Sequence, residues 1–157
     1  MGFAVTTSAP TPKTKNIRRI SLLTAAFFVV LAVTQLFTFE RFAEVIELAY
    51  GMLDSRGALV LSACIVTLEV AALPFFLAMP LSRAARFVSM TAGWVTIATW
   101  LALSLWQLLN RNESTALFGA TLDVPGGWWT VCFVAALGVL VAWTNWGMWP
   151  LSTKLRK

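Results

Sequence analysis

The sequence predicts an all-α fold: a membrane-embedded, antiparallel four-helix bundle with a short amphipathic helix in its first extracytoplasmic loop. The first observation is a set of apolar runs at about 20–39, 58–79, 87–109 and 128–149. A helix rises ~1.5 Å per residue, so about 20 apolar residues span the ~30 Å hydrocarbon layer. The second observation is composition, because 12% of the residues are charged and 59% are hydrophobic. This balance suits contact with lipid rather than with water.

The third observation is the distribution of charge, which predicts an orientation. Nine basic residues precede the first run, lie between the second and third runs, or end the chain: Lys13, Lys15, Arg18, Arg19, Arg83, Arg86, Lys154, Arg156 and Lys157. Cytoplasmic segments of membrane proteins carry an excess of lysine and arginine. The chain is therefore predicted to be a multi-pass protein of the bacterial cytoplasmic (inner) membrane, with both termini cytoplasmic.

The net charge of +5 does not indicate nucleic-acid binding, because the basic residues lie at segment ends rather than along one face. Their predicted partner is the lipid bilayer. A single four-helix transmembrane domain at 20–149 lies between a disordered cytoplasmic tail at 1–19 and a basic cytoplasmic tail at 150–157. A cleaved signal peptide is the alternative for the first run, but the run continues to Phe39 without a break, which favours a retained anchor.

The loop after the first run carries its own helical pattern. Phe42, Val45, Ile46, Ala49 and Leu53 recur at the spacing of one helical face, and acidic residues follow another face. This pattern predicts an amphipathic helix on the outer membrane surface or over the mouth of the bundle, ended by Gly57. The loop between the second and third runs has about seven residues, so those two helices are predicted to be neighbours.

Several kinds of chemistry are not expected from this chain. It has no histidine, which argues against haem, the usual zinc sites and histidine-based catalysis, and no metal site is predicted. It also has no glycine-rich phosphate motif. The composition therefore favours a protein that is not an enzyme.

Glu69 is the main candidate for function, because it is the only ionisable acid or base within the apolar runs. A buried carboxylate costs at least ~2.5 kcal/mol on insertion scales, so Glu69 is predicted to face the bundle interior. Its expected partners are Gln35, Thr96 or the backbone carbonyl of Val70, which loses its donor because Pro74 has no N–H. Two interpretations stay open: a group that binds a proton or a ligand, and a structural hydrogen bond between helices.

The third run has a mildly polar face, formed by Ser89, Gly93, Thr96, Trp100 and Gln107. With Gln35 from the first run, this face is predicted to line a shallow cavity that is open to the outside. Trp94 and Trp100 suggest a flat ligand such as a quinone, although tryptophans inside a bundle more often serve packing.

Cys64 and Cys132 are the only cysteines, and both lie within a few turns of the predicted outer ends of their helices. If the second and fourth helices touch there, the two form a candidate thiol-disulfide pair. The alternative is packing, because Cys64, Thr67, Ala71, Pro74 and Ala78 follow the spacing of a small-residue contact stripe between membrane helices.

The order of these features resembles the DoxX-like and MauE-like four-helix membrane proteins. The resemblance covers about residues 20–149 and rests on short segments: 35–39, the Arg41-Phe42 to Tyr50 stretch, Leu68-Glu69-Val70, Arg83-Ala84-Ala85 and Leu117-Phe118-Gly119. It implies that Glu69 matches the glutamate of the family's second helix. Members linked to thiol chemistry carry a Cys-x-Cys just before the Phe-Gly, where this chain has Thr115, Ala116 and Leu117. The resemblance therefore implies the accessory role of the family rather than its thiol role.

Three functions follow as hypotheses. In the first, the chain is a DoxX/MauE-like accessory protein that binds a small apolar or redox ligand, or a partner protein, and supports a membrane or periplasmic oxidoreductase. Its predicted ligand- or proton-binding residues are Glu69, Gln35, Thr96, Trp100 and Gln107, and a quinone is the only cofactor suggested. In the second, it is a structural subunit or scaffold of a larger membrane complex. In the third, it is a thiol-disulfide protein that uses Cys64 and Cys132.

Overall fold

The computed structural model describes residues 12–51, 53–110, 114–121, 124–125 and 127–149. Five helices make up most of this part: α1 (Lys15–Phe37), α2 (Phe39–Tyr50), α3 (Ser55–Phe76), α4 (Arg83–Asn110) and α5 (Trp128–Met148). Two short strands, β1 (Ser114–Thr115) and β2 (Val124–Pro125), pair antiparallel in the loop between α4 and α5. The predicted tail at 150–157 and the first eleven residues of the tail at 1–19 lie outside the described residues.

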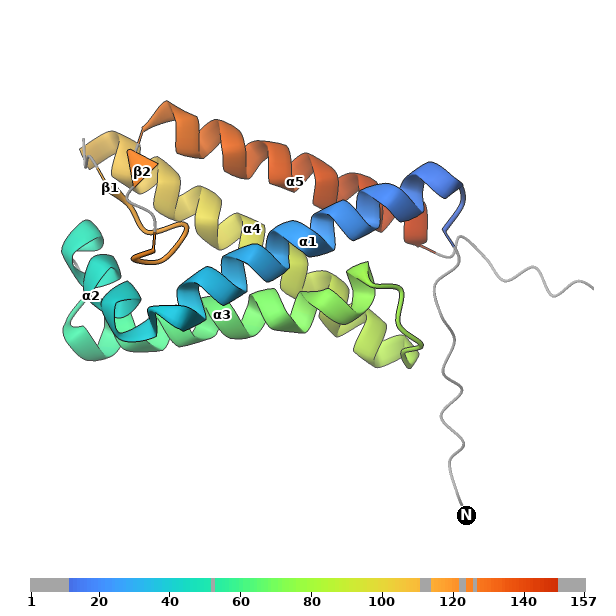
Figure 1. Ribbon diagram of the computed structural model, residues 1–157, viewed down its shortest axis with the longest axis horizontal. Coiled ribbons are helices and arrows are strands. Elements are labelled where there is room, and N and C mark those ends of the chain that lie inside the picture. Colours follow the sequence, from blue (N-terminus) through green and yellow to red (C-terminus); the bar gives the residue numbers. More distant parts are fainter. Residues whose placement is uncertain (1–11, 52, 111–113, 122–123, 126, 150–157) are drawn as a thin grey trace, which may run out of the picture.

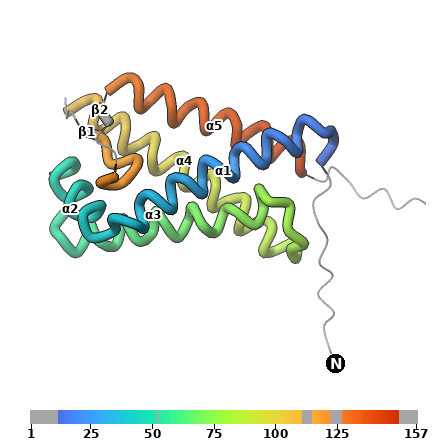
Figure 2. Tube along the Cα trace, in the orientation of Figure 1, coloured from blue at the N-terminus to red at the C-terminus, as the bar shows by residue number. Residues whose placement is uncertain are grey.

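The four long helices form an antiparallel bundle, as the sequence predicted. Going around it, α1 packs on α3, α3 on α4, α4 on α5, and α5 on α1. Figure 1 shows α1 and α4 between α5 and α3, so that α3 and α5 lie diagonally opposite each other. The trace in Figure 2 shows α2 at one end, beside the β1–β2 pair, and the start of α1 with the end of α5 at the other. We call these the α2 end and the terminal end.

Local capping sets where the helices begin and end. The Thr14 side chain accepts a hydrogen bond from the N–H of Ile17, so α1 begins at Lys15 and not at residue 20 as predicted. The Asp54 side chain accepts from the N–H of Gly57 in the same way and starts α3. The predicted stop at Gly57 is wrong, because Gly51 ends α2 with a left-handed φ of 51° that glycine adopts without steric cost.

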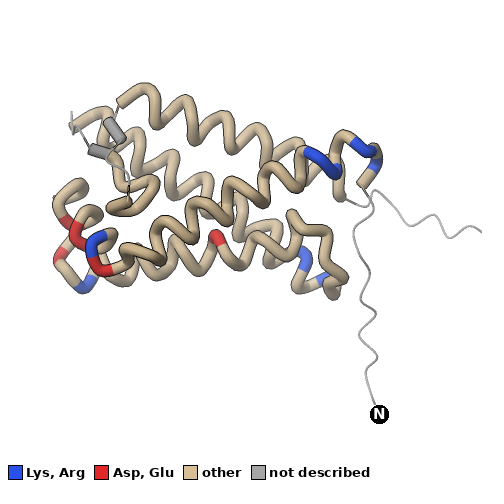
Figure 3. The backbone as a smooth tube through the Cα atoms, viewed as in Figure 1, with Lys and Arg blue, Asp and Glu red and all other residues tan. Residues whose placement is uncertain are grey.

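The bundle presents an apolar surface along its length. Each of the four long helices is long and apolar enough to cross a membrane, and the described exposed residues include many large apolar side chains. Figure 3 shows most of the basic residues at the terminal end, acidic residues at the α2 end, and one acid in the middle of α3. A water-soluble protein would not leave so much apolar surface uncovered, so this is the pattern of a multi-pass membrane protein.

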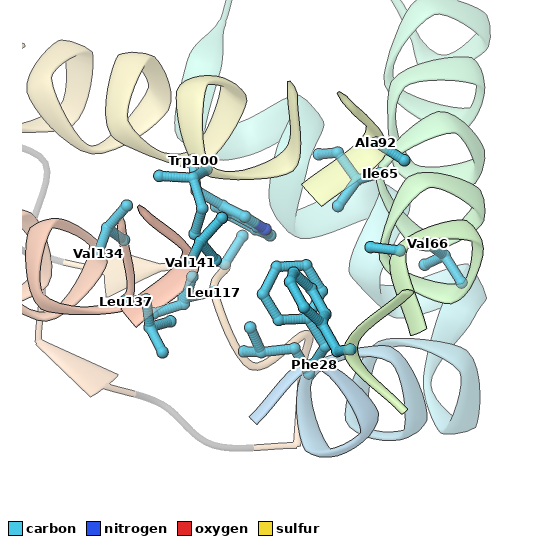
Figure 4. Close-up of a cluster of buried hydrophobic side chains, with 14 of the residues drawn as sticks. Phe28, Ile65, Val66, Ala92, Trp100, Leu117, Val134, Leu137 and Val141 are labelled. Carbon is cyan, nitrogen blue, oxygen red and sulfur yellow. The ribbon is translucent and has the colours of Figure 1, made fainter. Parts of the chain in front are cut away.

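A single core runs through the bundle. Figure 4 shows buried side chains from all four long helices meeting in it, among them Phe28, Val66, Trp100 and Val141. Leu117 joins this cluster although it comes from the loop between α4 and α5. The loop is therefore part of the packed structure at the α2 end.

The helix face that α3 turns inward differs from the predicted one. The predicted contact stripe is not the buried face: Cys64 and Thr67 are exposed, and Ala71, Pro74 and Ala78 are partly buried at its edge. The buried face instead consists of Ala58, Ser62, Ile65, Val66, Glu69, Ala72, Phe75 and Phe76. The interior therefore receives the single acid, large apolar side chains and a different set of small residues, Ala58, Ser62 and Ala72.

The Ser89 hydroxyl of α4 takes the place of one backbone hydrogen bond of α3 beside Pro74. Its hydroxyl donates to the carbonyl of Ala71 at 2.6 Å and accepts from the N–H of Phe75 at 3.1 Å. An unbroken helix would pair these two backbone groups with each other. The α3–α4 pair is thus joined by a side chain inserted into the backbone ladder, which accounts for the buried position of Ser89 on the predicted polar face.

Replacing Ser89 with alanine is expected to destabilise the bundle by about 1–3 kcal/mol, because the buried Phe75 N–H and Ala71 carbonyl lose their partner. The measurement is the free energy of unfolding in mixed micelles. Thr91→Ala is the matched control, since the Thr91 hydroxyl is exposed and donates only to carbonyls of its own helix. Equal losses in the two variants would contradict the role given to Ser89.

Candidate functional site

Glu69 lies fully buried at the centre of a polar cluster. Its Oε1 accepts one hydrogen bond from Nε2 of Gln35 at 3.1 Å and another from Nε1 of Trp100 at 3.0 Å. Gln35 comes from α1 and Trp100 from α4, so the carboxyl of one α3 residue connects three helices. We call Gln35, Glu69 and Trp100 the Glu69 cluster. All three side chains are at most 2% exposed.

The cluster also reaches the loop between α4 and α5. Nε2 of Gln35 donates to the backbone carbonyl of Leu117 at 3.1 Å, in addition to Glu69. Leu117 and Ala116 have no exposed surface, so this part of the loop is inserted between the helices. We call residues 115–121 the inserted loop. The amide of one glutamine thus connects the inserted loop to the buried acid.

Further hydrogen bonds hold the inserted loop on α1 and on Thr38, the residue between α1 and α2. The N–H of Ala120 donates to the Thr38 hydroxyl at 3.2 Å, and the Thr121 hydroxyl donates to the carbonyl of Thr34 at 3.1 Å. Within the loop, the N–H of Leu117 donates to the Thr115 hydroxyl at 3.2 Å. The loop is therefore fixed at several points and covers the end of the bundle above the Glu69 cluster.

Gly119 permits the close approach of this loop to α1. Its φ of 63° lies in the left-handed region. A Cβ at this position would lie 3.1 Å from the Cα of Gln35 and 3.1 Å from the carbonyl oxygen of Thr34, both of which are backbone atoms. Glycine is needed here both for its backbone conformation and for the space.

Two polar atoms of the cluster have no hydrogen-bond partner among the described residues. They are Oε2 of Glu69 and Oε1 of Gln35, and both are buried. Buried polar atoms normally have partners, and both of these oxygens could accept a hydrogen bond from a further donor. A proton on Oε2 of Glu69 would leave both hydrogen bonds to Oε1 in place.

The structure places the other predicted site residues inside the bundle but not in the cluster. The hydroxyl of Thr96 donates to the carbonyl of Ala92 in its own helix and not to Glu69. Gln107 is 1% exposed, close to the last turn of α4. The polar face predicted for α4 is buried, because Ser89, Thr96, Trp100 and Gln107 are each at most 4% exposed.

The two tryptophans suggested for a flat ligand lie in different surroundings. Trp100 is buried, and its indole N–H donates to the carboxyl of Glu69. Trp94 is 42% exposed and lies in a groove between α4 and α5, so the two rings do not line one site. The hydrogen bond to the Leu117 carbonyl could not be predicted from the sequence, because every residue type carries a backbone acceptor.

The two cysteines are free and exposed. Cys64 is on α3 and Cys132 is on α5, the diagonal pair of the bundle. Their side chains face away from the core, so the geometry gives the predicted thiol-disulfide pair no support. The described residues also bring together no group of three or more acidic or cysteine side chains that could hold a metal ion.

The α2 end has a surface of its own, formed by the end of α1, the turn after it and α2. Phe37 and Leu48 are 87% and 83% exposed, beside the exposed charges of Glu40 and Glu44. A groove of about 400 Å³ is lined by residues 36–41. On the opposite face, α2 packs on α3 and buries Tyr50, and this burial raises the pKa of the Tyr50 phenol. We call the exposed side the α2 surface.

Comparison of the chain with protein-family models, with curated proteins and with solved structures finds no match. The resemblance to DoxX-like and MauE-like proteins therefore rests on the sequence segments alone.

Proposed function

We propose that this chain is a membrane accessory protein of the DoxX-like and MauE-like kind, which binds a partner protein at its α2 end. The partner would be a membrane or periplasmic oxidoreductase, as the resemblance implies. In this proposal Glu69 is a positioning residue: it holds the inserted loop beside the α2 surface, and the partner binds the combined surface.

One observation carries the proposal, namely the continuous hydrogen-bond path from the Glu69 carboxyl through the Gln35 amide to the Leu117 carbonyl. A carboxyl that served an external ligand would be reached from outside, but Glu69 has no exposed surface. A fully enclosed polar group with hydrogen bonds to several elements fixes one arrangement of those elements. The site residues thus favour control of the shape of the α2 end over ligand binding at Glu69.

The α2 surface supports a partner of mixed chemistry. It combines exposed apolar side chains with the exposed charges of Glu40, Arg41 and Glu44, and its excess of acid would favour basic groups on a partner. Under the positive-inside rule this surface would lie outside the cytoplasm, where a periplasmic enzyme could reach it.

The test is photo-crosslinking from single positions in native membranes. A photoreactive residue at Leu48 on the α2 surface is expected to give one dominant adduct, which mass spectrometry identifies as an oxidoreductase subunit. The matched control is Val139 on α5, which is also apolar and 61% exposed but lies away from the α2 end. Glu69→Leu should abolish the Leu48 adduct and Glu69→Gln should retain it. Adducts of equal yield from both positions, or none at Leu48, would overturn the proposal.

The scaffold hypothesis makes a different prediction in the same experiment. The exposed small residues of α3, Ala63, Cys64 and Thr67, would allow a neighbouring membrane helix to approach closely. A scaffold should therefore give its dominant adduct from a thiol-reactive crosslinker at the exposed Cys64, independent of Glu69.

A further inference from the structure

The Glu69 cluster has more buried hydrogen-bond acceptors than donors. Its donors are one N–H of Trp100 and the two N–H groups of Gln35, which bond Oε1 of Glu69 twice and the Leu117 carbonyl once. Oε2 of Glu69 and Oε1 of Gln35 are left without a partner among the described residues. Both side chains are fully buried, so water outside the bundle does not reach these two oxygens. With the carboxyl ionised, the cluster therefore lacks donors.

One proton on Oε2 would complete this set of hydrogen bonds. The two unpartnered oxygens belong to the carboxyl and the amide that the 3.1 Å hydrogen bond from Nε2 to Oε1 already joins. A neutral carboxylic acid and a primary amide are complementary in both directions. The amide N–H donates to one acid oxygen, and the acid O–H can donate to the amide oxygen. The pair thus has the donors and acceptors to hold one proton.

No charged side chain faces Glu69 from the described parts of the helices packed on α3. Figure 3 shows this acid by itself in the middle of the bundle, with the other charges at the two ends. The inserted loop has no charged residue, and the one titratable group on the buried face of α2 is the phenol of Tyr50. The other charged residues of α1 to α4 are Lys15, Arg18, Arg19, Glu40, Arg41, Glu44, Glu47, Arg56, Arg83 and Arg86. A buried carboxylate without a counter-charge is much less stable than the neutral acid.

We propose that Glu69 and Gln35 together bind one proton between Oε2 and Oε1, and that this proton keeps the inserted loop in place. The inference rests on the proposed function, because it concerns how the loop beside the α2 surface is held. When the O–H bond breaks and the proton passes to water at the α2 end, Oε2 becomes an ionised acceptor without a donor.

The ionised carboxylate competes for the hydrogen bond that holds the loop. Of the three N–H groups in the cluster, only the one on the Leu117 carbonyl is not already bonded to Glu69. A hydrogen bond to a charged acceptor is roughly twice as strong as one to a neutral carbonyl, so this N–H moves to Oε2. The loop then loses its bond to Gln35. Low pH therefore keeps the loop inserted, and rising pH releases it.

A trapped water molecule is the other occupant that the two oxygens could accept, since it also brings two donors. It would leave the carboxylate ionised. Glu69 is the only charged residue among the buried side chains that the structure describes, so nothing there balances this charge. A proton instead removes the charge and supplies the missing donor.

The first measurement is infrared spectroscopy of the full chain in vesicles of phosphatidylethanolamine and phosphatidylglycerol, titrated from mildly acidic to alkaline buffer. The carbonyl stretch of a protonated carboxyl is expected in mildly acidic buffer. It should disappear as the pH rises and be absent from Glu69→Gln at every pH. Glu44→Gln is the matched control and should keep the band, because Glu44 is an exposed acid of α2. A carboxylate at Glu69 throughout the titration would indicate a trapped water molecule and overturn the inference.

The second measurement is maleimide labelling of Ala116→Cys over the same titration, in the chain without Cys64 and Cys132. Relative to the same cysteine in Glu69→Gln, labelling should rise on the order of tenfold as the carboxyl ionises, a shift that corresponds to about 1.4 kcal/mol. The Glu69→Gln background corrects for the pH dependence of the thiol itself. Its amide stays neutral and can donate to Gln35 as the acid O–H does. The helix content should stay constant.

Equal pH dependence of labelling in the parent and in Glu69→Gln would overturn the inference. Loss of helix content at the pH where labelling rises would overturn it too, because that is unfolding and not release of the loop. Either result can occur while Glu69→Leu still abolishes the Leu48 adduct, so the proposal for the α2 end would stand. Conversely, a Leu48 adduct that never forms contradicts the proposed function, and the infrared band still decides whether Glu69 binds the proton.

Discussion

Replacing Glu69 with leucine is expected to destabilise the bundle by about 2–4 kcal/mol, because two buried donors lose their acceptor at about 1–2 kcal/mol each. The donors are Nε1 of Trp100 and one N–H of Gln35. The loss should appear as a lower free energy of unfolding in mixed micelles.

Glu69→Gln is the matched control for this prediction. Its side-chain oxygen can accept the same two hydrogen bonds from a side chain of nearly the same shape, so a loss below about 1 kcal/mol is expected. Comparing the two variants separates the effect of losing the hydrogen-bond acceptor from the effect of losing the acidic group. If glutamine destabilises the bundle as much as leucine does, the cluster depends on the acid itself and not on the hydrogen bonds described.

Gly119→Ala is expected to cost about 2–3 kcal/mol, because it adds steric crowding to the ~1–2 kcal/mol of a left-handed alanine. The new Cβ would meet backbone atoms of α1 at 3.1 Å, which cannot move aside as a flexible side chain can. The inserted loop should therefore detach from α1 while the four long helices stay assembled. The measurement combines the free energy of unfolding with protease sensitivity of the loop.

Gly51→Ala isolates the backbone part of that cost. Gly51 has a similar φ of 51°, but a Cβ there would meet nothing within 4 Å. Only about 1 kcal/mol is expected for this variant, localised to the end of α2. Equal effects of the two alanines would mean that the contact between the inserted loop and α1 contributes nothing.

The helices themselves could be predicted, because length and apolar content decide which segments cross a membrane. The face of α3 that packs in the core could not be predicted. Residues 55–76 are apolar nearly all round, so no periodic contrast marks the interior, and small residues and large ones both suit a helix contact. The structure buries Phe75 and Phe76 and leaves Cys64 and Thr67 outside. The position of Glu69 marks the buried face of α3 correctly, since a carboxyl cannot face lipid without a large free-energy cost.

The Glu69 cluster was predictable in part for the same reason. Gln35 could be named as one of three possible partners of Glu69, because few polar residues occur in the apolar runs. Trp100 was placed on the correct face of α4, but its N–H was not recognised as the donor. The inserted loop could not be foreseen at all, since its main contact is the backbone carbonyl of Leu117, which every residue type carries.

The central claim is that the carboxyl of Glu69 holds the inserted loop in place through Gln35. Its most direct test is thiol labelling of Ala116→Cys in a chain without Cys64 and Cys132, because Ala116 has no exposed surface while the loop is inserted. The account predicts slow labelling by a water-soluble maleimide in the parent and in Glu69→Gln, and fast labelling in Glu69→Leu. Equally slow labelling in Glu69→Leu, with the bundle folded, would contradict it.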